Sequence, residues 1–485
     1  MNPDRMMSFD EAARLMSGAT LRGRGALYFT GVCTDSRTVR AGDLFVALRG
    51  PRFDGHDHAT VAVAAGAVGV MVEHALDIEA PQIIVPNTLR ALGWLAALWR
   101  ARFELPVIAV TGSNGKTTVT QMLAAILAQA HGAAHRWATR GNMNNEIGVP
   151  LTLLGLTAQH RAAVIELGMN HPGEIAALAA MTRPTVALVN NAQREHQEFL
   201  TSVEATAREN GAVIEALCAD GVAVFPADDP CAPLWRRLAG THRILDFALR
   251  DGGHPEASHS DSGSDSAATI TAQAAAAAGG RTALVVESPA GVIEMELTLC
   301  GRHMLHNALA ATACALAIEI EPRHIAAALS TFVPVAGRGT PTRLASGALL
   351  IDESYNANPD SVRAAIDLLM SQSAPSVLML GDMGEVGLQG PAFHREVGDY
   401  ARNQGVATLL ALGEATRDTV LAFGKGATHF DDMDALIERA RIEATKGGTL
   451  LVKGSRFMHM ERVVAALNAE SERSEFNGAP MVHSH

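Results

Sequence analysis

The chain has 485 residues, 48% hydrophobic and 19% charged, with a formal net charge of −12. This length is too great for one hydrophobic core, so we expect about three domains. The acidic balance and the absence of a basic block argue against nucleic acid as a partner, although they allow a local basic pocket for an anionic substrate. The five cysteines lack CxxC spacing, and no apolar leader or membrane span is evident. We therefore expect reduced thiols and a cytoplasmic protein.

The first block, residues 1–104, mixes short apolar segments with helical patterns. Ser8 and Glu11 form the capping-box pattern that begins a helix. Strands are predicted at 43–48, 68–72 and 82–85. We expect a small α/β domain here.

Two further blocks alternate strands with helices, which predicts parallel sheets. In residues 105–334 the predicted strands are 107–110, 163–166, 185–190 and 221–225, and in residues 335–485 they are 349–352, 376–380, 408–412 and 449–452. The fold class is therefore α/β with three domains: a central doubly wound parallel sheet, a Rossmann-like C-terminal domain and the smaller N-terminal domain. Residues 251–280 are rich in Ser, Asp, Gly and Ala, which predicts a disordered insertion in the central domain.

The sequence VIAVTGSNGKTT at residues 107–118 has the pattern of a buried strand, a glycine loop and the start of a helix. Backbone N–H groups of such a loop and the helix N-terminus favour phosphate. Lys116 would supply positive charge to the outer phosphates, and Thr117 a hydroxyl ligand for magnesium. Val110 stands where the common P-loop has glycine, so this loop is the short type. The predicted ATP contacts here are Thr111, Gly112, Ser113, Asn114, Gly115, Lys116, Thr117 and Thr118.

Two acids at strand ends compete as partners of the magnesium ion in this site. Glu166 ends a strand of the same predicted sheet as the loop, whereas Asp352 ends a strand of the C-terminal domain. A parallel sheet brings the carboxyl ends of its own strands together, which favours Glu166. Asp352 would then act from across a cleft, for example on the ribose.

Asparagines gather at other predicted strand ends. Asn142, Asn144 and Asn145 lie within four residues, and Asn190 and Asn191 close another strand. Turns also use asparagine freely, but ligand crevices form at this edge of a parallel sheet. We interpret these side chains as part of one ligand site.

Six motifs in this order resemble the Mur ligases: TGSNGKTT, GNMNNEIGVP, VIELGMNHPGEI, HNALAA, DESYNANPDS and GDMGEVG. In the first block, TDSR, GDLFVAL and DGH are similar to the UDP-binding domain of that family. The resemblance extends from about residue 30 to 460. It implies an enzyme that uses ATP to activate a peptide carboxylate as an acyl phosphate, which an amine then attacks.

The resemblance also implies roles for individual residues. It makes Lys116, His196 and Arg338 catalytic, with Arg338 reaching the phosphates when the domains close about 334–339. One magnesium would be held by Thr117 and Glu166 and a second by His196. Further nucleotide contacts would be Asn307 at adenine, Asp352 at ribose, and Tyr355 and Asn356 beside them. The implied substrate contacts are Ser36, Arg37, Asp54, His56, Asn142, Asn144 and Asn145.

The branch of the family is indicated by the NANPDS and GNxNNEIG runs, which favour joining of D-alanyl-D-alanine to UDP-N-acetylmuramoyl-tripeptide in peptidoglycan precursor synthesis. No DNPR run, expected for diaminopimelate selection, is present. Alternatives are another Mur-type or folylpolyglutamate-type ligase and, from a different class, a P-loop switch ATPase, against which the lack of an NKxD motif argues. We expect a monomer.

One departure from the family concerns a carbamylated lysine that supplies a carboxylate to the second magnesium. The corresponding place falls near Asn210, with no lysine nearby. Glu209 could substitute, but its adjacency to Asn210 on a helix would point it elsewhere. How the second cation is held therefore stays open from the sequence.

Overall fold

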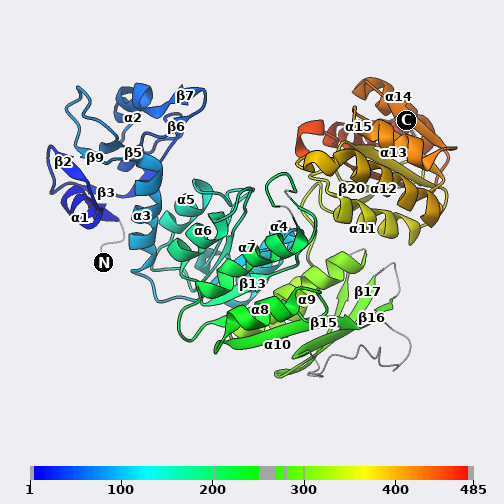
Figure 1. The fold of residues 1–485 in the computed structure, drawn as a ribbon, viewed down its shortest axis with the longest axis horizontal. Helices are drawn as coiled ribbons and strands as arrows, with labels where there is room; N and C mark the ends of the chain where they lie inside the picture. The colour runs from blue at the N-terminus through cyan, green and yellow to red at the C-terminus, as the bar shows by residue number, and fades with distance from the viewer. Residues whose placement is uncertain are drawn as a thin grey trace, which may run out of the picture.

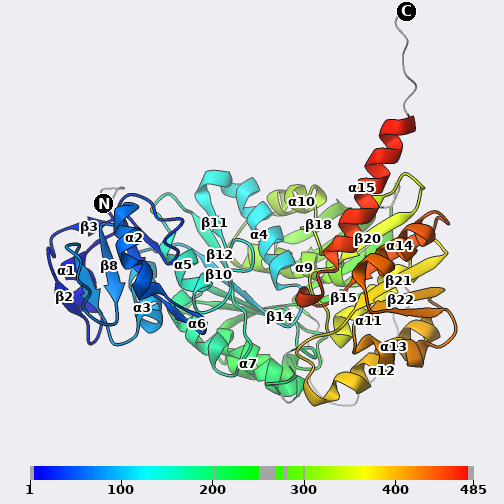
Figure 2. The same ribbon diagram turned by 90° about the horizontal axis from the view of Figure 1, so that it is seen from above.

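The computed structural model describes residues 5–195, 197–200, 202–250, 268–277, 281–298 and 301–478. Three α/β units follow one another along the chain, each built on its own mainly parallel sheet. The N-terminal and C-terminal units lie on either side of the central one (Figure 1), and from above the three form a row in chain order (Figure 2). The predicted three-domain α/β class is confirmed.

The N-terminal unit has a five-stranded sheet in the order β2-β9-β8-β5-β4 and two small strand pairs. Ser8 Oγ accepts a hydrogen bond from the Glu11 N–H and caps the first helix, as the sequence predicts. The elements are β1 Met7–Ser8, α1 Phe9–Leu15, β2 Thr20–Arg22, β3 Tyr28–Phe29, β4 Gly31–Cys33, β5 Asp43–Val46, β6 Arg49–Gly50, β7 Phe53–Asp54, α2 Ala59–Ala64, β8 Gly69–Val72, β9 Gln82–Ile84 and α3 Thr88–Arg100.

The central unit has a nine-stranded sheet in the order β11-β12-β10-β13-β14-β15-β16-β17-β18. Its elements are β10 Val107–Thr111, α4 Lys116–His131, β11 Arg136–Ala138, α5 Gly148–Leu154, β12 Ala162–Glu166, α6 Glu174–Thr182, β13 Val186–Val189, α7 Val203–Glu215, β14 Val222–Pro226, α8 Ala232–Ala239, β15 Arg243–Arg250, β16 Ile270–Ala276, β17 Thr282–Ser288, β18 Gly291–Leu297, α9 Arg302–Ala317 and α10 Pro322–Ser330. The strands from β11 to β16 pair in parallel, and β17 and β18 extend the sheet in antiparallel fashion.

Helices cover both faces of this sheet. Along β10, Val107 and Ala109 belong to one hydrophobic core with α5 to α8, whereas Ile108 and Val110 belong to another with α4, α9 and α10. Because alternate residues of a strand point to opposite faces, a continuous apolar strand fits a sheet that is buried on both sides. This packing fixes the carboxyl end of β10, from which the glycine loop begins.

The prediction of a disordered insertion is wrong for residues 268–277. Here β16 pairs with β15 and β17, and Ile270 and Ala272 are buried. A strand of small side chains has weak local preference, so the neighbouring strands decide its conformation. The rest of the predicted insertion, 251–267 and 278–280, lies outside the described residues.

The C-terminal unit has a six-stranded sheet in the order β19-β20-β24-β21-β22-β23, parallel except for β19. Its elements are β19 Thr340–Arg343, β20 Leu349–Glu353, α11 Pro359–Met370, β21 Ser376–Gly381, α12 Gly390–Gln404, β22 Thr408–Leu412, α13 Thr416–Phe423, β23 Ala427–Phe430, α14 Met433–Ala444, β24 Thr449–Lys453 and α15 Glu461–Gly478. Helices again cover both faces.

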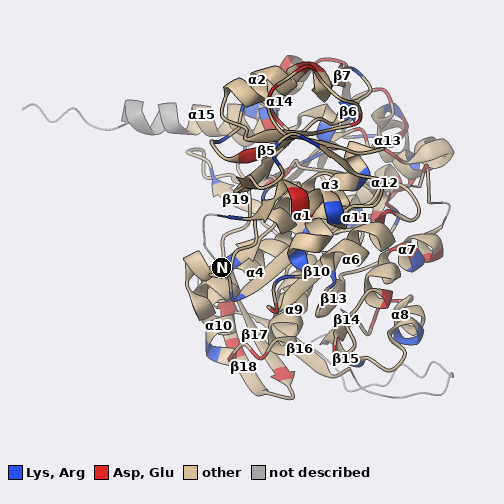
Figure 3. Cartoon of the chain, turned by 90° about the vertical axis from the view of Figure 1, so that its left-hand side faces the viewer, with Lys and Arg blue, Asp and Glu red and all other residues tan. Residues whose placement is uncertain are grey.

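The surface carries charges of both signs. On the face seen in Figure 3, Lys and Arg are interspersed with Asp and Glu among the described residues. Within the described ranges, no helix has both the length and the apolar character needed to cross a membrane.

Candidate active site

The glycine loop lies between β10 and α4, with Lys116 as the first residue of the helix. Gly112 and Gly115 have φ of 132° and 83°, a region that residues with a Cβ rarely adopt. A Cβ on Gly115 would come within 2.3 Å of Asn307 Oδ1, so this position also needs glycine for space. The loop therefore has the backbone geometry that phosphate binding at a helix N-terminus requires.

Polar groups of the segment after β13 and of helix α7 hold the loop. The Asn114 N–H donates to Asn191 Oδ1 at 2.8 Å, and the Gln193 N–H donates to Ser113 Oγ at 2.9 Å. From α7, Asn210 Oδ1 accepts hydrogen bonds from Thr111 Oγ1 at 2.6 Å and the Gly112 N–H at 3.0 Å. These contacts fix the loop before any ligand binds.

The Lys116 ammonium points back into its own loop. Its Nζ donates to the carbonyls of Gly112 and Ser113 at 2.6 and 3.1 Å and to Glu195 Oε1 at 3.0 Å. Both members of the Lys116–Glu195 ion pair are largely shielded from solvent. A phosphate group would compete with these oxygens for the ammonium.

Glu166 ends β12 beside the loop, as predicted. Its Oε1 accepts hydrogen bonds from Thr117 Oγ1 at 3.1 Å and Asn144 Nδ2 at 2.7 Å. Its Oε2 is buried and has no hydrogen-bond partner among the described residues. A buried carboxylate oxygen left in this way is suited to a divalent cation, as is the neighbouring hydroxyl. The described residues form no group of three or more metal-ligating side chains, so a cation here needs further oxygen ligands such as those of phosphate.

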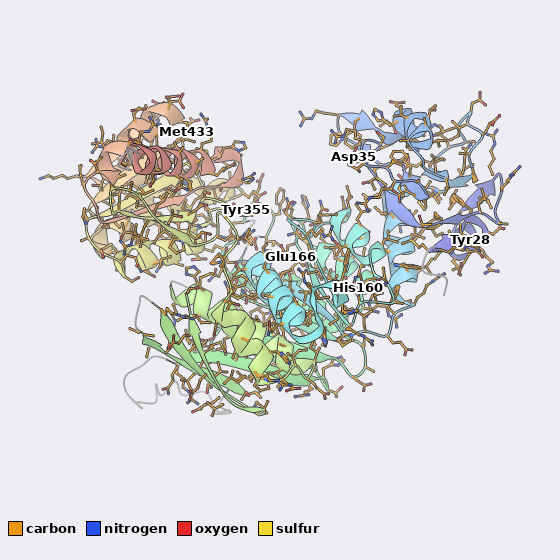
Figure 4. The ribbon with its side chains drawn as sticks, turned by 180° about the vertical axis from the view of Figure 1, so that it is seen from behind. Tyr28, Asp35, His160, Glu166, Tyr355 and Met433 are labelled. Atoms are coloured by element: carbon orange, nitrogen blue, oxygen red, sulfur yellow. The ribbon has the colours of Figure 1, made fainter. Side chains whose placement is uncertain are left out.

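A cavity of about 440 Å³ opens over this corner of the sheet. Residues predicted for the site line it from both sides: Ser113, Asn114, Gly115, Lys116, Thr117, Asn142, Asn144, Asn145, Glu166, Arg338, Tyr355 and Asn356. Figure 4 shows Tyr355 on the side of the C-terminal unit that faces Glu166 of the central unit. The site is thus shared between two units.

A second cavity, of about 650 Å³, continues along the same cleft. Asn307 and Thr118 line it from the central unit, and Asn307 Oδ1 accepts a hydrogen bond from Asn190 Nδ2 at 2.9 Å. Arg338 and Tyr355 border both cavities, and the Arg338 guanidinium lies 3.9 Å from the centre of the Tyr355 ring. The two cavities together give an elongated cleft that passes over the glycine loop.

Asp352 does not line either cavity in this conformation. Its Oδ2 accepts a hydrogen bond from the Gly337 N–H at 2.8 Å, and its Oδ1 accepts from the N–H and Oγ of Ser354. The carboxylate therefore holds the segment that connects the two units. A ribose contact by Asp352 stays a prediction.

Two residues that sequence reasoning missed lie at strand ends of the C-terminal sheet. Lys453 Nζ lies 3.5 Å from Glu353 Oε2 and donates to the Asn356 carbonyl at 2.9 Å, and His303 Nε2 approaches Glu353 Oε1 from the central unit at 3.6 Å. Burial alone would raise the pKa of Glu353, but the Lys453 ammonium and His303 outweigh it and hold this pKa at about 2. The run Lys453-Gly454-Ser455 at the carboxyl end of a buried strand was a usable signal.

A salt-bridge cluster joins the two units, and sequence reasoning missed it as well. Arg194, in the loop after β13, donates to Asp360 on α11 and to Glu396 on α12 through paired contacts of 2.6 to 3.1 Å. Hydrogen bonds to Glu396 and Asp360 raise the pKa of Arg194. Burial acts to raise the pKa of Asp360, but the Arg194 guanidinium lowers it overall. Asn358 and Asn114 add a further contact across the cleft.

The residues predicted to contact the UDP part of the substrate do not line the cavity that lies between the N-terminal and central units. A third cavity, of about 740 Å³, lies between the N-terminal and central units, with Thr34, Asp35 and Trp137 in its lining. Ser36, Arg37, Asp54 and His56 do not line it. Arg37 pairs with Asp35, and hydrogen bonds from Arg37 lower the pKa of Asp35 to about 2. The buried His56 is held by Asp54 and by the Glu73 N–H.

The residues considered as ligands of a second cation differ in where the structure places them. His196 lies outside the described residues. Glu209 accepts hydrogen bonds from the N–H groups of Gly173 and Ile175 and caps α6, so it does point away from the loop as expected. Asn210 is fully buried against the loop itself.

Comparisons with known proteins match nearly the whole chain. Family models described as the Mur ligase family catalytic domain, the Mur ligase middle domain and the Mur ligase glutamate ligase domain match residues 28–100, 110–315 and 337–456. The chain is 40% identical over 438 residues, 90% of its length and 93% of the relative's, to UDP-N-acetylmuramoyl-tripeptide–D-alanyl-D-alanine ligase of Escherichia coli.

Solved structures are also similar to this chain over nearly its whole length. A crystal structure of MurF from Acinetobacter baumannii is 30% identical, with a TM-score of 0.87 over 96% of this chain and 100% of that one. MurF ligase from Thermotoga maritima in complex with ADP is 25% identical, with a TM-score of 0.79 over 92% of this chain and 98% of that one.

Proposed function

This chain belongs to the Mur ligase family, and we propose that it joins D-alanyl-D-alanine to UDP-N-acetylmuramoyl-tripeptide at the expense of ATP. The observation that carries the proposal is the cavity in which the glycine loop, Glu166 and the asparagine cluster meet Arg338 of another unit. Nearly full-length similarity to ligases of that name supports the choice of substrates. We place the activity in the cytoplasm, in peptidoglycan precursor synthesis, and assign it to a monomer.

The reaction has two steps. A carboxylate oxygen of the tripeptide attacks the γ-phosphorus of ATP, and the bond to the β–γ bridging oxygen breaks to release ADP and leave an acyl phosphate. The free amine of the dipeptide then attacks the acyl carbon, loses a proton and expels phosphate, which forms the amide. Phosphorylation by ATP thus converts a carboxylate oxygen, which is a poor leaving group, into a phosphate, which is a good one.

Different residues of this chain stabilise charge and position the substrate in the first step. Lys116 leaves its carbonyl and Glu195 partners and stabilises negative charge on the transferring phosphoryl group. Arg338, from the opposite side of the cleft, adds a second positive charge when the units close. Asn142, Asn144 and Asn145 line the side of the cavity where the tripeptide carboxylate would enter.

Magnesium fits the residues present. Thr117 and Glu166 would hold it, since the buried Glu166 Oε2 lacks a partner among the described residues. When bound, the ion supplies charge neutralisation to the phosphate oxygens. His196 is assigned to a second cation by family resemblance.

Nucleotide and substrate would occupy the three cavities. Asn307 and Tyr355 border the cavity of about 650 Å³, which extends away from the glycine loop and suits adenosine. The cavity of about 740 Å³ near Asp35 suits the UDP group. Ser36, Arg37, Asp54 and His56 keep their proposed roles toward the substrate, and Asp352 keeps its proposed role toward the ribose, in the ligand-bound protein.

The test is the mass of the product after incubation with ATP, UDP-N-acetylmuramoyl-tripeptide and one amine at a time. D-alanyl-D-alanine should be added with one ADP per amide formed, whereas glutamate and diaminopimelate should not. ADP release should be slow when either co-substrate is omitted. Transfer of another amine, or ATP turnover indifferent to both co-substrates, would reject the proposal in favour of a different ligase or a P-loop switch ATPase.

A further inference from the structure

Helix α7 gives the phosphate loop a neutral amide where the family resemblance expects a carbamylated lysine. Asn210 Oδ1 already accepts two hydrogen bonds, from Thr111 Oγ1 and the Gly112 N–H. The adjacent Glu209 binds the N–H groups at the start of α6 with both of its carboxylate oxygens. Neither residue therefore places a carboxylate beside the phosphates.

A carboxylate does reach the loop from the segment that follows β13. Glu195 is only 8% exposed, and its Oε1 lies 3.0 Å from Lys116 Nζ. It lines the same cavity of about 440 Å³ as Thr117 and Glu166. Two acids, Glu166 at the end of β12 and Glu195 in the segment after β13, thus border the place where the outer phosphates would lie.

The backbone on the N-terminal side of Glu195 is fixed. The Gln193 N–H donates to Ser113 Oγ, and the Arg194 N–H donates to Asp360 Oδ2 of the C-terminal unit at 2.9 Å. The phosphate loop and the C-terminal unit therefore both position this carboxylate. Its place in the cavity is determined by two units and not by side-chain rotamer alone.

We propose that Glu195 is the carboxylate ligand of a second divalent cation, in place of the carbamylated lysine that this chain lacks. The inference rests on the proposed function, because it requires ATP at the glycine loop. When Lys116 turns to the phosphates, the Glu195 carboxylate lies close to a triphosphate in a site shielded from water. Two such anions repel strongly unless a cation lies between them, and carboxylate and phosphate oxygens are ligands that magnesium prefers.

The number of bound Mn²⁺ ions per chain can be measured directly, so Mn²⁺ is the probe. Full-length protein is saturated with a non-hydrolysable ATP analogue and titrated with Mn²⁺, and free Mn²⁺ is measured by electron paramagnetic resonance. The wild type should bind two ions per chain. Glu195→Gln should keep one ion, at Thr117 and Glu166, and bind the second at least roughly tenfold more weakly. Glutamine keeps the side-chain length and can still accept from Lys116, and thermal unfolding checks that the variant folds.

Glu198→Gln is the matched control, because Glu198 lies in the same loop but is exposed. It should bind both ions as the wild type does. If Glu195→Gln does not fold, Glu195→Asp retains the charge on a shorter side chain, and it should weaken only the second ion.

Two unaltered manganese sites in Glu195→Gln would overturn the assignment, and so would a single site in the wild type. Product mass is measured on the same wild-type preparation. A wild type that forms the dipeptide-extended product while Glu195→Gln keeps both ions refutes the role of Glu195 and leaves the ligase function intact. Absence of product would count against the proposed function instead.

Discussion

Replacing Arg194 with methionine tests whether the salt-bridge cluster between the central and C-terminal units sets the rate of catalysis. The substitution removes the guanidinium that binds Asp360 and Glu396. Methionine keeps an unbranched side chain that can still pack against Phe393, whose ring lies 5.1 Å from the guanidinium carbon. The change thus removes charge with little loss of apolar contact.

The size of the effect follows from the exposure of the partners. Hydrogen bonds between charged groups contribute about 1.5–3 kcal/mol when well shielded, whereas exposed ion pairs contribute about 1 kcal/mol or less. The Arg194 and Asp360 side chains are 19% and 23% exposed. Glu396 is 35% exposed and keeps Arg363 as a partner at 3.2 Å. We therefore expect a loss of about 2 kcal/mol, which corresponds to a roughly 30-fold lower ratio of closed to open molecules.

Steady-state kinetics and small-angle X-ray scattering together provide the assay. With saturating substrates, kcat should fall roughly tenfold or more, and scattering should indicate a more extended particle. Arg395→Met is the control, because Arg395 lies on the same helix as Glu396 but pairs with Asp418 within the C-terminal unit. Wild-type kcat and unchanged scattering in Arg194→Met would refute the coupling between this contact and turnover.

Four further outcomes are expected. Lys116→Ala should abolish ligation at saturating ATP while the chain still folds, as product mass and circular dichroism would establish. Arg338→Ala should lower kcat more than it weakens nucleotide binding measured by calorimetry, since its charge acts mainly on the transition state. Deleting residues 252–267 should change the unfolding midpoint by no more than a few degrees, whereas a deletion extended through 277 should lower it further, because it removes β16. The pKa of Glu353 is lowered from 4.5 to about 2, so its stabilising effect is complete above 4.5 and is lost as pH falls toward 2. The difference in unfolding midpoint between the wild type and Glu353→Gln should accordingly shrink as pH falls from about 5 to about 3.

Local patterns predicted the parts of the site that one strand and the next few residues define. The apolar run of β10 and the glycines after it predicted both the loop and the helix that begins at Lys116. The rule that parallel strands share a carboxyl edge placed Glu166 beside Thr117, and the two side chains are hydrogen-bonded. These features depend on contacts within one sheet, which the order of elements already implies.

Other features depend on contacts that the order of elements does not contain. Arg194 has no motif of its own, and its importance comes from two helices of another unit. In the sequence, Asn210 lies near the place where the family resemblance expects a metal-ligating lysine. In the structure, its side-chain amide holds the start of the glycine loop. Composition suggested that the segment of β16 would be disordered, but β16 pairs with β15 on one side and with β17 on the other. In each case a distant partner decides the role of the residue.

The two parallel sheets present their carboxyl ends to one cleft, and this arrangement determines how the chemistry is divided. Glu166 ends a strand of the central sheet, and Glu353 and Lys453 end strands of the C-terminal sheet. Neither sheet alone encloses a nucleotide, because Arg338 and Asn356 complete both cavities from the opposite side. Phosphoryl transfer in an open cleft would expose the acyl phosphate to water, whereas the proposed closure would bring positive charge and exclude solvent in the same movement. Splitting the site between two units would therefore link activation of the carboxylate to the state in which an amine, and not water, is the available nucleophile.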